Sequence, residues 1–183
     1  MRKYLVVLVI GVFFLPINAI SSIYYSAGIN YLLPTDKFKD KNKNSVGLKL
    51  EVMNKNYCRL WYGLRIDHFN LKKNNQVSYY KKETLISPVV KYSPFVRDCF
   101  DNKLLPYIEG QINLSSISGT DNLSKLGLGG GLGLGIAYNF KLFKKCWMID
   151  AEALYSAPNF IYRADKRDNL KSINCGLSLS VSL

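Results

Sequence analysis

Residues 173–183 constrain the fold of this chain more than any other stretch. They read Ile-Asn-Cys-Gly-Leu-Ser-Leu-Ser-Val-Ser-Leu, with apolar residues at every odd position and small or polar residues at every even one. A strict period of two indicates a β-strand that turns one face toward an apolar medium. A tilted strand that crosses a bilayer needs about 10 residues, which is the length of this stretch. It therefore predicts the closing strand of a membrane β-barrel.

Residues 1–19 have the features of a secretory signal peptide. Arg2 and Lys3 precede an apolar run from Leu5 to Leu15, Pro16 ends that run, and Ala19 supplies a small residue for cleavage. The run is shorter than the ~20 residues that a transmembrane helix needs. The sequence thus predicts a signal peptide over 1–19 and a single domain over 20–183, which would enter a membrane as strands.

Other stretches of the chain alternate in the same way. Together with the last one they give eight candidate strands: 23–33, 45–54, 57–71, 77–92, 104–116, 125–140, 146–156 and 173–183. The fourth alternates poorly and contains Pro88, which predicts a sheet edge or a bulge at that point. Connections are short after the second and sixth strands and long after the first and seventh, as in an up-and-down outer-membrane barrel. The predicted fold is an all-β, eight-stranded antiparallel transmembrane barrel with both termini at one end.

The polar faces of these strands carry charged side chains. By parity, nine of them point away from the apolar medium: Lys49, Glu51, Arg59, Arg65, Asp67, Lys91, Glu109, Asp150 and Glu152. A membrane barrel encloses such groups, and because unpaired buried charge is costly, its interior needs the two signs in near balance. Eight strands make a barrel just wide enough for side chains to fill. The alternate glycines within 127–135 leave room for long side chains from neighbouring strands, so the sequence predicts a filled lumen and not a diffusion pore.

Aromatic residues gather near both ends of the candidate strands. Those near the short turns are Tyr25, Tyr57, Tyr92, Tyr107, Tyr138, Phe140 and Trp147, and those near the opposite ends are Tyr31, Phe69, Tyr79, Tyr80 and Tyr155. Two aromatic belts at interfacial depth are typical of membrane barrels. The alternative is the general preference of tyrosine for strands.

The cysteines lie in a chain that is predicted to reach an oxidising compartment. Cys58, Cys99 and Cys146 map to the short-turn end, so Cys99 is a candidate disulfide partner of Cys146 or of Cys58. Cys175 faces lipid by parity and serves there as a small apolar residue. Because no Cys-x-x-Cys or Cys/His spacing is present, the sequence predicts no metal site and no cofactor.

The chain is basic, with 25 Lys and Arg against 13 Asp and Glu and a formal net charge of +12. The basic residues cluster in the predicted loops 37–43, 72–73 and 163–167 and not along one helix, which disfavours a nucleic-acid partner. Such loops suit either plain solvation or contact with lipopolysaccharide phosphates. The glycine-rich run 127–135 has a period of two, which is wrong for a nucleotide-binding loop that enters a helix.

Four segments resemble the small outer-membrane β-barrel family of Bacteroidetes-type bacteria, including its PorT-like and OmpX-like barrels. They are Leu-Ile-Ser-Pro-Val-Val-Lys-Tyr at 85–92, Leu-Pro-Tyr-Ile-Glu-Gly at 105–110, Gly-Ile-Ala-Tyr at 135–138 and Ile-Asp-Ala-Glu-Ala-Leu-Tyr-Ser at 149–156. The last strand also resembles the signal read by the outer-membrane insertion machinery, with Asn174, Gly176, Leu179 and Val181 at matching positions, although it ends in Leu183 where an aromatic residue is common. The resemblance implies a Gram-negative outer membrane, with its lipid, its lipopolysaccharide, the insertion machinery and a secretion or gliding apparatus as partners.

Three classes of function fit these observations. The first, which the sequence favours, is a non-enzymatic structural or partner-binding barrel that acts through its extracellular loops. The second is an enzyme that modifies lipid A, built on His68, the only histidine, with Asp67, Ser78 and Asp121 as candidate partners. Because the parity of His68 matches that of Ile66, its side chain should face outward, which favours an interfacial histidine on the barrel wall. The third is a soluble periplasmic binding barrel.

Overall fold

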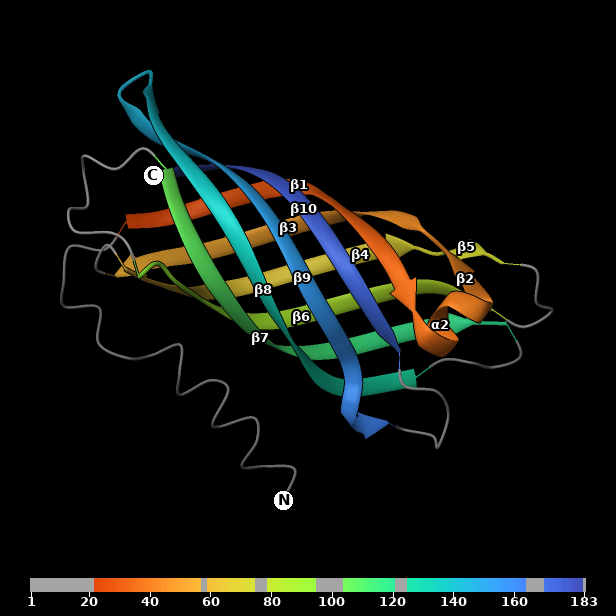
Figure 1. Ribbon diagram of the computed structural model, residues 1–183. Helices are drawn as coiled ribbons and strands as arrows, with labels where there is room; N and C mark the ends of the chain where they lie inside the picture. Colours follow the sequence, from red (N-terminus) through yellow and green to blue (C-terminus); the bar gives the residue numbers. More distant parts are fainter. Residues whose placement is uncertain are drawn as a thin grey trace.

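The computed structural model describes residues 22–56, 59–74, 79–94, 104–120, 125–163 and 170–182. Its long strands form one closed antiparallel barrel, in the order β1-β10-β9-β8-β7-β6-β4-β3 (Figure 1). They are β1 (Ser22–Thr35), β3 (Ser45–Asn56), β4 (Leu60–Asn70), β6 (Tyr80–Tyr92), β7 (Leu104–Gly119), β8 (Lys125–Leu142), β9 (Lys145–Arg163) and β10 (Lys171–Ser182). Each corresponds to one predicted strand, so the predicted fold class is confirmed. The predicted signal peptide lies outside the described residues and stays a prediction.

The barrel closes by pairing its first strand with its last. Tyr24 of β1 lies opposite Ser182 of β10, and Thr35 lies opposite Lys171. The start of β1 and the end of β10 therefore share one end of the barrel, here called the terminus end. The other end, here called the loop end, holds the short helix α2 (Figure 1).

The polarity of the barrel is inverted relative to that of a soluble protein. In β10, Asn174, Ser178 and Ser180 are buried, whereas Leu177 and Leu179 between them are exposed. Leu132 of β8 is 74% exposed and Arg65 of β4 is fully buried. An apolar exterior around a charged interior is the arrangement that a bilayer requires, and the closed barrel leaves no sheet edge exposed to lipid.

The loop end carries more regular structure than the sequence predicts for its basic loops. Residues after β1 form α2 (Asp36–Lys41) and β2 (Asn42–Lys43), and β2 pairs with β5 (Lys72–Lys73) to make a small separate sheet. Phe38 of α2 is buried with its ring edge-on to Tyr80, the two centroids 6.0 Å apart. A helix this short with one buried residue shows no helical period, so the pattern predicted only a loop.

Across the described residues, no helix is long and apolar enough to cross a membrane.

Strand β6 alternates poorly because it carries apolar residues on both of its faces. Its inward positions Leu85 and Val89 are apolar and buried, and its outward positions Ile86 and Val90 are apolar as well. The edge or bulge predicted at Pro88 is wrong, because the closed barrel has no edge and the register is the same on both sides of this residue. Proline lacks an N–H group, and the β6–β7 pairing accordingly skips from Ile86 to Val89.

The aromatic belts are confirmed in part. Tyr25, Tyr92 and Tyr138 are exposed on the outer face at the terminus end, and Tyr31 is exposed toward the loop end, whereas Tyr155 is exposed near the middle of β9.

Three other belt residues were predicted wrongly. Phe69, Tyr80 and Tyr107 are buried inside the barrel. Phe69 shares the parity of Arg65 and Asp67, so the sequence itself placed it on the inner face.

Candidate functional site

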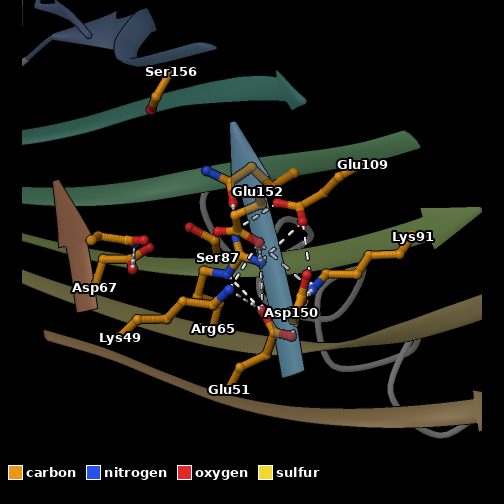
Figure 2. Close-up of polar contacts among 12 residues, drawn as sticks. Lys49, Glu51, Arg65, Asp67, Ser87, Lys91, Glu109, Asp150, Glu152 and Ser156 are labelled. Carbon is orange, nitrogen blue, oxygen red and sulfur yellow. Dashed lines mark hydrogen bonds and ion pairs between the residues drawn. The ribbon is translucent and has the colours of Figure 1, made fainter. Parts of the chain in front are cut away.

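The centre of the barrel interior holds charged side chains from five strands (Figure 2). Those in ionic contact are Lys49 and Glu51 of β3, Arg65 of β4, Lys91 of β6, Glu109 of β7, and Asp150 and Glu152 of β9. None of these residues is more than 8% exposed. Each lies on the inward face because its strand alternates with a period of two, so seven of the nine predicted lumen residues meet in one group, here called the charge network.

Arg65 joins three walls of the barrel. Its Nη1 and Nη2 atoms donate to the two carboxylate oxygens of Glu109, at 2.6 and 3.0 Å. Its Nε atom donates to Glu51 at 2.7 Å, and its Nη2 atom also reaches Glu152 at 2.9 Å. Figure 2 shows the guanidinium between these acids, where its planar fork suits paired carboxylate oxygens.

The two lysines complete the charge network. Lys91 Nζ lies 2.9 Å from Glu51 Oε1 and 2.7 Å from Asp150 Oδ2. Lys49 Nζ lies 2.8 Å from Glu152 Oε2. Taking charges out of water is costly, and close oppositely charged partners offset that cost only when the remaining donors and acceptors are also used.

Tyr107 packs into the charge network beside a glycine. Its hydroxyl donates to Asp150 Oδ1 at 2.5 Å, and Lys91 Nζ lies 4.9 Å from the centre of its ring. A Cβ atom at Gly135 would lie 2.2 Å from Tyr107 Cζ, so the ring occupies the space that a side chain would need. The expectation that glycines of β8 make room for long side chains from a neighbouring strand is met at this position.

Two apolar clusters flank the charge network along the barrel. The cluster at the terminus end contains Tyr24, Met53, Trp61, Val89, Leu105, Tyr107, Ala137 and Met148. The cluster at the loop end contains Leu32, Phe38, Phe69, Leu71, Tyr80, Leu85, Ile117 and Leu170. Parity alone did not predict them, because it says which residues face inward but not which inward residues from distant strands share one level.

Of the two remaining predicted lumen residues, one lies inside the barrel and the other does not. Asp67 is buried and accepts a hydrogen bond from Asn30 Nδ2 at 2.5 Å. Arg59 was predicted wrongly, because it is exposed just before β4 begins at the terminus end. Parity holds only while a residue is within the sheet, and Arg59 is not.

Sequence reasoning missed one buried acid, Glu83 of β6. It is 1% exposed and shares the inward parity of Leu85 and Lys91, a signal that the poor alternation of this strand obscured. The described interior therefore holds three basic side chains, Lys49, Arg65 and Lys91, and six acidic ones, whereas the sequence predicts four and five. The acids are Glu51, Asp67, Glu83, Glu109, Asp150 and Glu152.

His68 lies on the outer wall, as parity predicts. Its Nδ1 atom is 2.9 Å from Thr84 Oγ1 on the adjacent strand, and the neighbouring Asp67 points into the barrel. The other candidate partners, Ser78 and Asp121, lie outside the described residues.

We expect the His68→Ala variant to leave the acylation of lipid A unchanged, because among the described residues the His68 ring has the Thr84 hydroxyl as a partner but no carboxylate to orient it. Mass spectrometry of lipid A from cells that express the wild type or the variant checks this. A difference in acyl chains between the two would revive the enzyme hypothesis.

The described cysteines carry free thiols, Cys146 half-buried and Cys175 exposed on the outer face. Because the Cys146 thiol is free, the predicted Cys99–Cys146 disulfide is absent from this structure. Cys58 and Cys99 lie outside the described residues, so the alternative Cys99–Cys58 disulfide stays a prediction. Within the part of the chain that the structure describes, no group of three or more His, Cys, Asp or Glu residues is placed to hold a metal ion.

Comparison with known proteins gives a structural likeness. No family model matches the chain, and no curated protein does. The barrel is similar to Neisserial surface protein A, with 13% sequence identity, coverage of 89% of this chain and 99% of that one, and a TM-score of 0.64. It is also similar to the N-terminal β-barrel domain of OprF from Pseudomonas aeruginosa, with 14% identity, 89% and 97% coverage, and a TM-score of 0.49. Together with its apolar exterior and its closed eight-stranded sheet, the first likeness gives this chain the fold of the small outer-membrane β-barrels.

Proposed function

We propose that this chain is an integral outer-membrane protein with a closed, side-chain-filled lumen, and that it acts as a structural or partner-binding barrel through the loops at its loop end. The observation that carries the proposal is the charge network, which joins β3, β4, β6, β7 and β9 across the interior. An open pore would leave these side chains in water along the walls, where they would be exposed. Here they are buried and paired with one another.

The two apolar clusters support a closed lumen. An ion that passed along the barrel axis would have to enter the cluster around Phe69 and Tyr80 and leave through the cluster around Trp61 and Met148. Moving an ion into such packed apolar surroundings is very unfavourable. The barrel would therefore not conduct.

Placement in the outer membrane brings a set of expected partners. Lipid would surround the exposed leucines of β8 and β10, and lipopolysaccharide would surround the loop end. The insertion machinery would read β10, whose residues Asn174, Gly176, Leu179 and Val181 match its signal. The PorT-like motifs at 85–92 and 149–156 support a relationship to the Bacteroidetes-type barrels and a role beside a secretion or gliding apparatus.

Planar-bilayer recording tests the closed lumen. We expect the purified protein to insert and show no large, steady conductance at moderate voltage. A shift of the folded band on heating before electrophoresis would confirm that the inserted sample is folded. Steady openings from folded protein would contradict the proposal.

A further inference from the structure

We propose that Lys43 and Lys72, at the loop end, form a binding site for the phosphate groups of lipid A in the outer leaflet. The inference rests on the proposed outer-membrane function and names one ligand site within it. Four observations carry it: the register of these two lysines, the rigidity of their backbone, the charge around them and their place on the barrel.

The register sets two like charges side by side. In the small sheet, Lys43 of β2 lies directly opposite Lys72 of β5, and both side chains are exposed. Residues directly opposite one another share a face of the sheet with their Cβ atoms about 4.5–5.5 Å apart, and like charges in that position are destabilising. Asn42 on the other face turns inward and is buried.

Hydrogen bonds hold the backbone of Lys43 and Lys72 in place. Asn42 Nδ2 donates to the carbonyl oxygens of Tyr80 at 2.7 Å and Lys72 at 3.2 Å. Ser45 Oγ donates to the Lys43 carbonyl and accepts from the Lys72 N–H, both at 3.0 Å.

Asn74 ties the same sheet to α2. Its side chain donates to the Lys39 carbonyl at 2.9 Å, and its backbone N–H donates to the Lys41 carbonyl at 3.0 Å. The side chains of Asn42, Ser45 and Asn74 thus hold the backbone of the small sheet, and the sheet presents the amino groups of Lys43 and Lys72 outward.

The described surroundings of Lys43 and Lys72 are strongly basic. The described residues of the loop end carry the lysines Lys37, Lys39, Lys41, Lys43, Lys72, Lys73, Lys81, Lys82 and Lys171. The exposed acids among them are Asp36, which pairs with Lys171 at 3.0 Å, and Asp40. Within the described residues, no carboxylate lies at ion-pair distance from Lys43 or Lys72. Together with the described residues around it, the pair therefore presents two positive charges to which an anionic group of another molecule can bind.

Lipid phosphate is the ligand that fits this position. A phosphate offers several oxygens to two adjacent ammonium groups, which bind it as point charges. The small sheet stands at one end of the barrel with α2, next to the ends of the membrane-spanning strands (Figure 1). In the proposed orientation that is the level of the outer-leaflet headgroups, where lipid A carries its phosphates.

The matched control lies at the opposite end of the barrel. Lys144 and Lys145, in the β8–β9 hairpin, are adjacent exposed lysines, so the Lys144→Gln/Lys145→Gln variant loses the same charge as Lys43→Gln/Lys72→Gln. All changed side chains are exposed, and heat-modified migration confirms that each variant folds.

The experiment titrates fluorescent bisphosphorylated lipid A into the purified, detergent-solubilised protein. We expect Lys43→Gln/Lys72→Gln to bind it roughly tenfold more weakly than the wild type, and the control variant to bind it as the wild type does. Dephosphorylated lipid A should bind the wild type as weakly as it binds the double variant. Unchanged affinity in Lys43→Gln/Lys72→Gln, or an equal loss in the control, would overturn the site.

Competition with inorganic phosphate tests the source of the phosphate. If inorganic phosphate displaces lipid A when the two are present at equal concentrations, the assignment to lipid is overturned. Weak displacement under these conditions supports it. Because binding is measured on purified protein, it is independent of the cellular location. Fractionation away from the outer membrane would contradict the proposed function and leave the binding result as it stands.

Discussion

Replacing Arg65 with methionine is expected to lower the free energy of unfolding by about 3–5 kcal/mol, the usual cost of removing one partner from a buried ionic group. The side chain is fully buried, and its loss leaves Glu51, Glu109 and Glu152 close together with less positive charge among them. Denaturant titration of the protein folded in lipid vesicles measures the change. Trp61, in the adjacent apolar cluster, is a suitable fluorescent reporter.

The control for this prediction is Arg59→Met. Arg59 precedes Arg65 on the same segment but is exposed at the terminus end. Exposed ion pairs contribute about 0–1 kcal/mol, so the unfolding free energy of this variant should stay within about 1 kcal/mol of that of the wild type. Equal destabilisation by both changes would mean that the charge network does not hold the strands together.

Replacing Leu132 with arginine is expected to cost about 2–4 kcal/mol in a bilayer, the penalty for a cation on the lipid face of a barrel near the midplane. Leu132 is 74% exposed on the outer face of β8, opposite Gly110 of β7 and Tyr155 of β9. The same change on the surface of a soluble protein would bring a charge into water at almost no cost. The sign and size of the effect therefore identify the medium that surrounds the barrel.

The matched control is Leu126→Arg, on the same strand and face. Leu126 is 67% exposed but lies where β8 begins at the loop end, near the water interface. There the arginine should cost only about 0–1 kcal/mol. Unfolding in lipid vesicles compares the two variants, and equal, negligible costs would remove the evidence for a transmembrane orientation.

The fold could be predicted from the sequence because a period of two survives in nearly every strand. In a barrel of this kind each strand has its own apolar face, so the pattern of β10 can be read without knowing its neighbours. The same parity placed Arg65, Lys91 and Glu152 in the interior, where the structure brings them into contact.

The errors arise where the position of a residue depends on something other than its parity. Arg59 has the right parity but lies beyond the end of the sheet. Glu83 lies in β6, where apolar residues on both faces obscure which face is the inner one. The small sheet of β2 and β5 depends on Asn42 reaching Tyr80, a contact between distant segments that no local pattern predicts.

The β1–β10 seam has a consequence for the order of assembly. The inward residues of β10 along the seam are Ser172, Asn174, Gly176, Ser178 and Ser180, and those of β1 include Ser26, Gly28 and Asn30. The seam thus brings no charged side chain into the interior, since every member of the charge network belongs to β3, β4, β6, β7 or β9. An open sheet of those strands can form its ion pairs first. The first and last strands can then pair with each other without moving an ammonium or a carboxylate group between them.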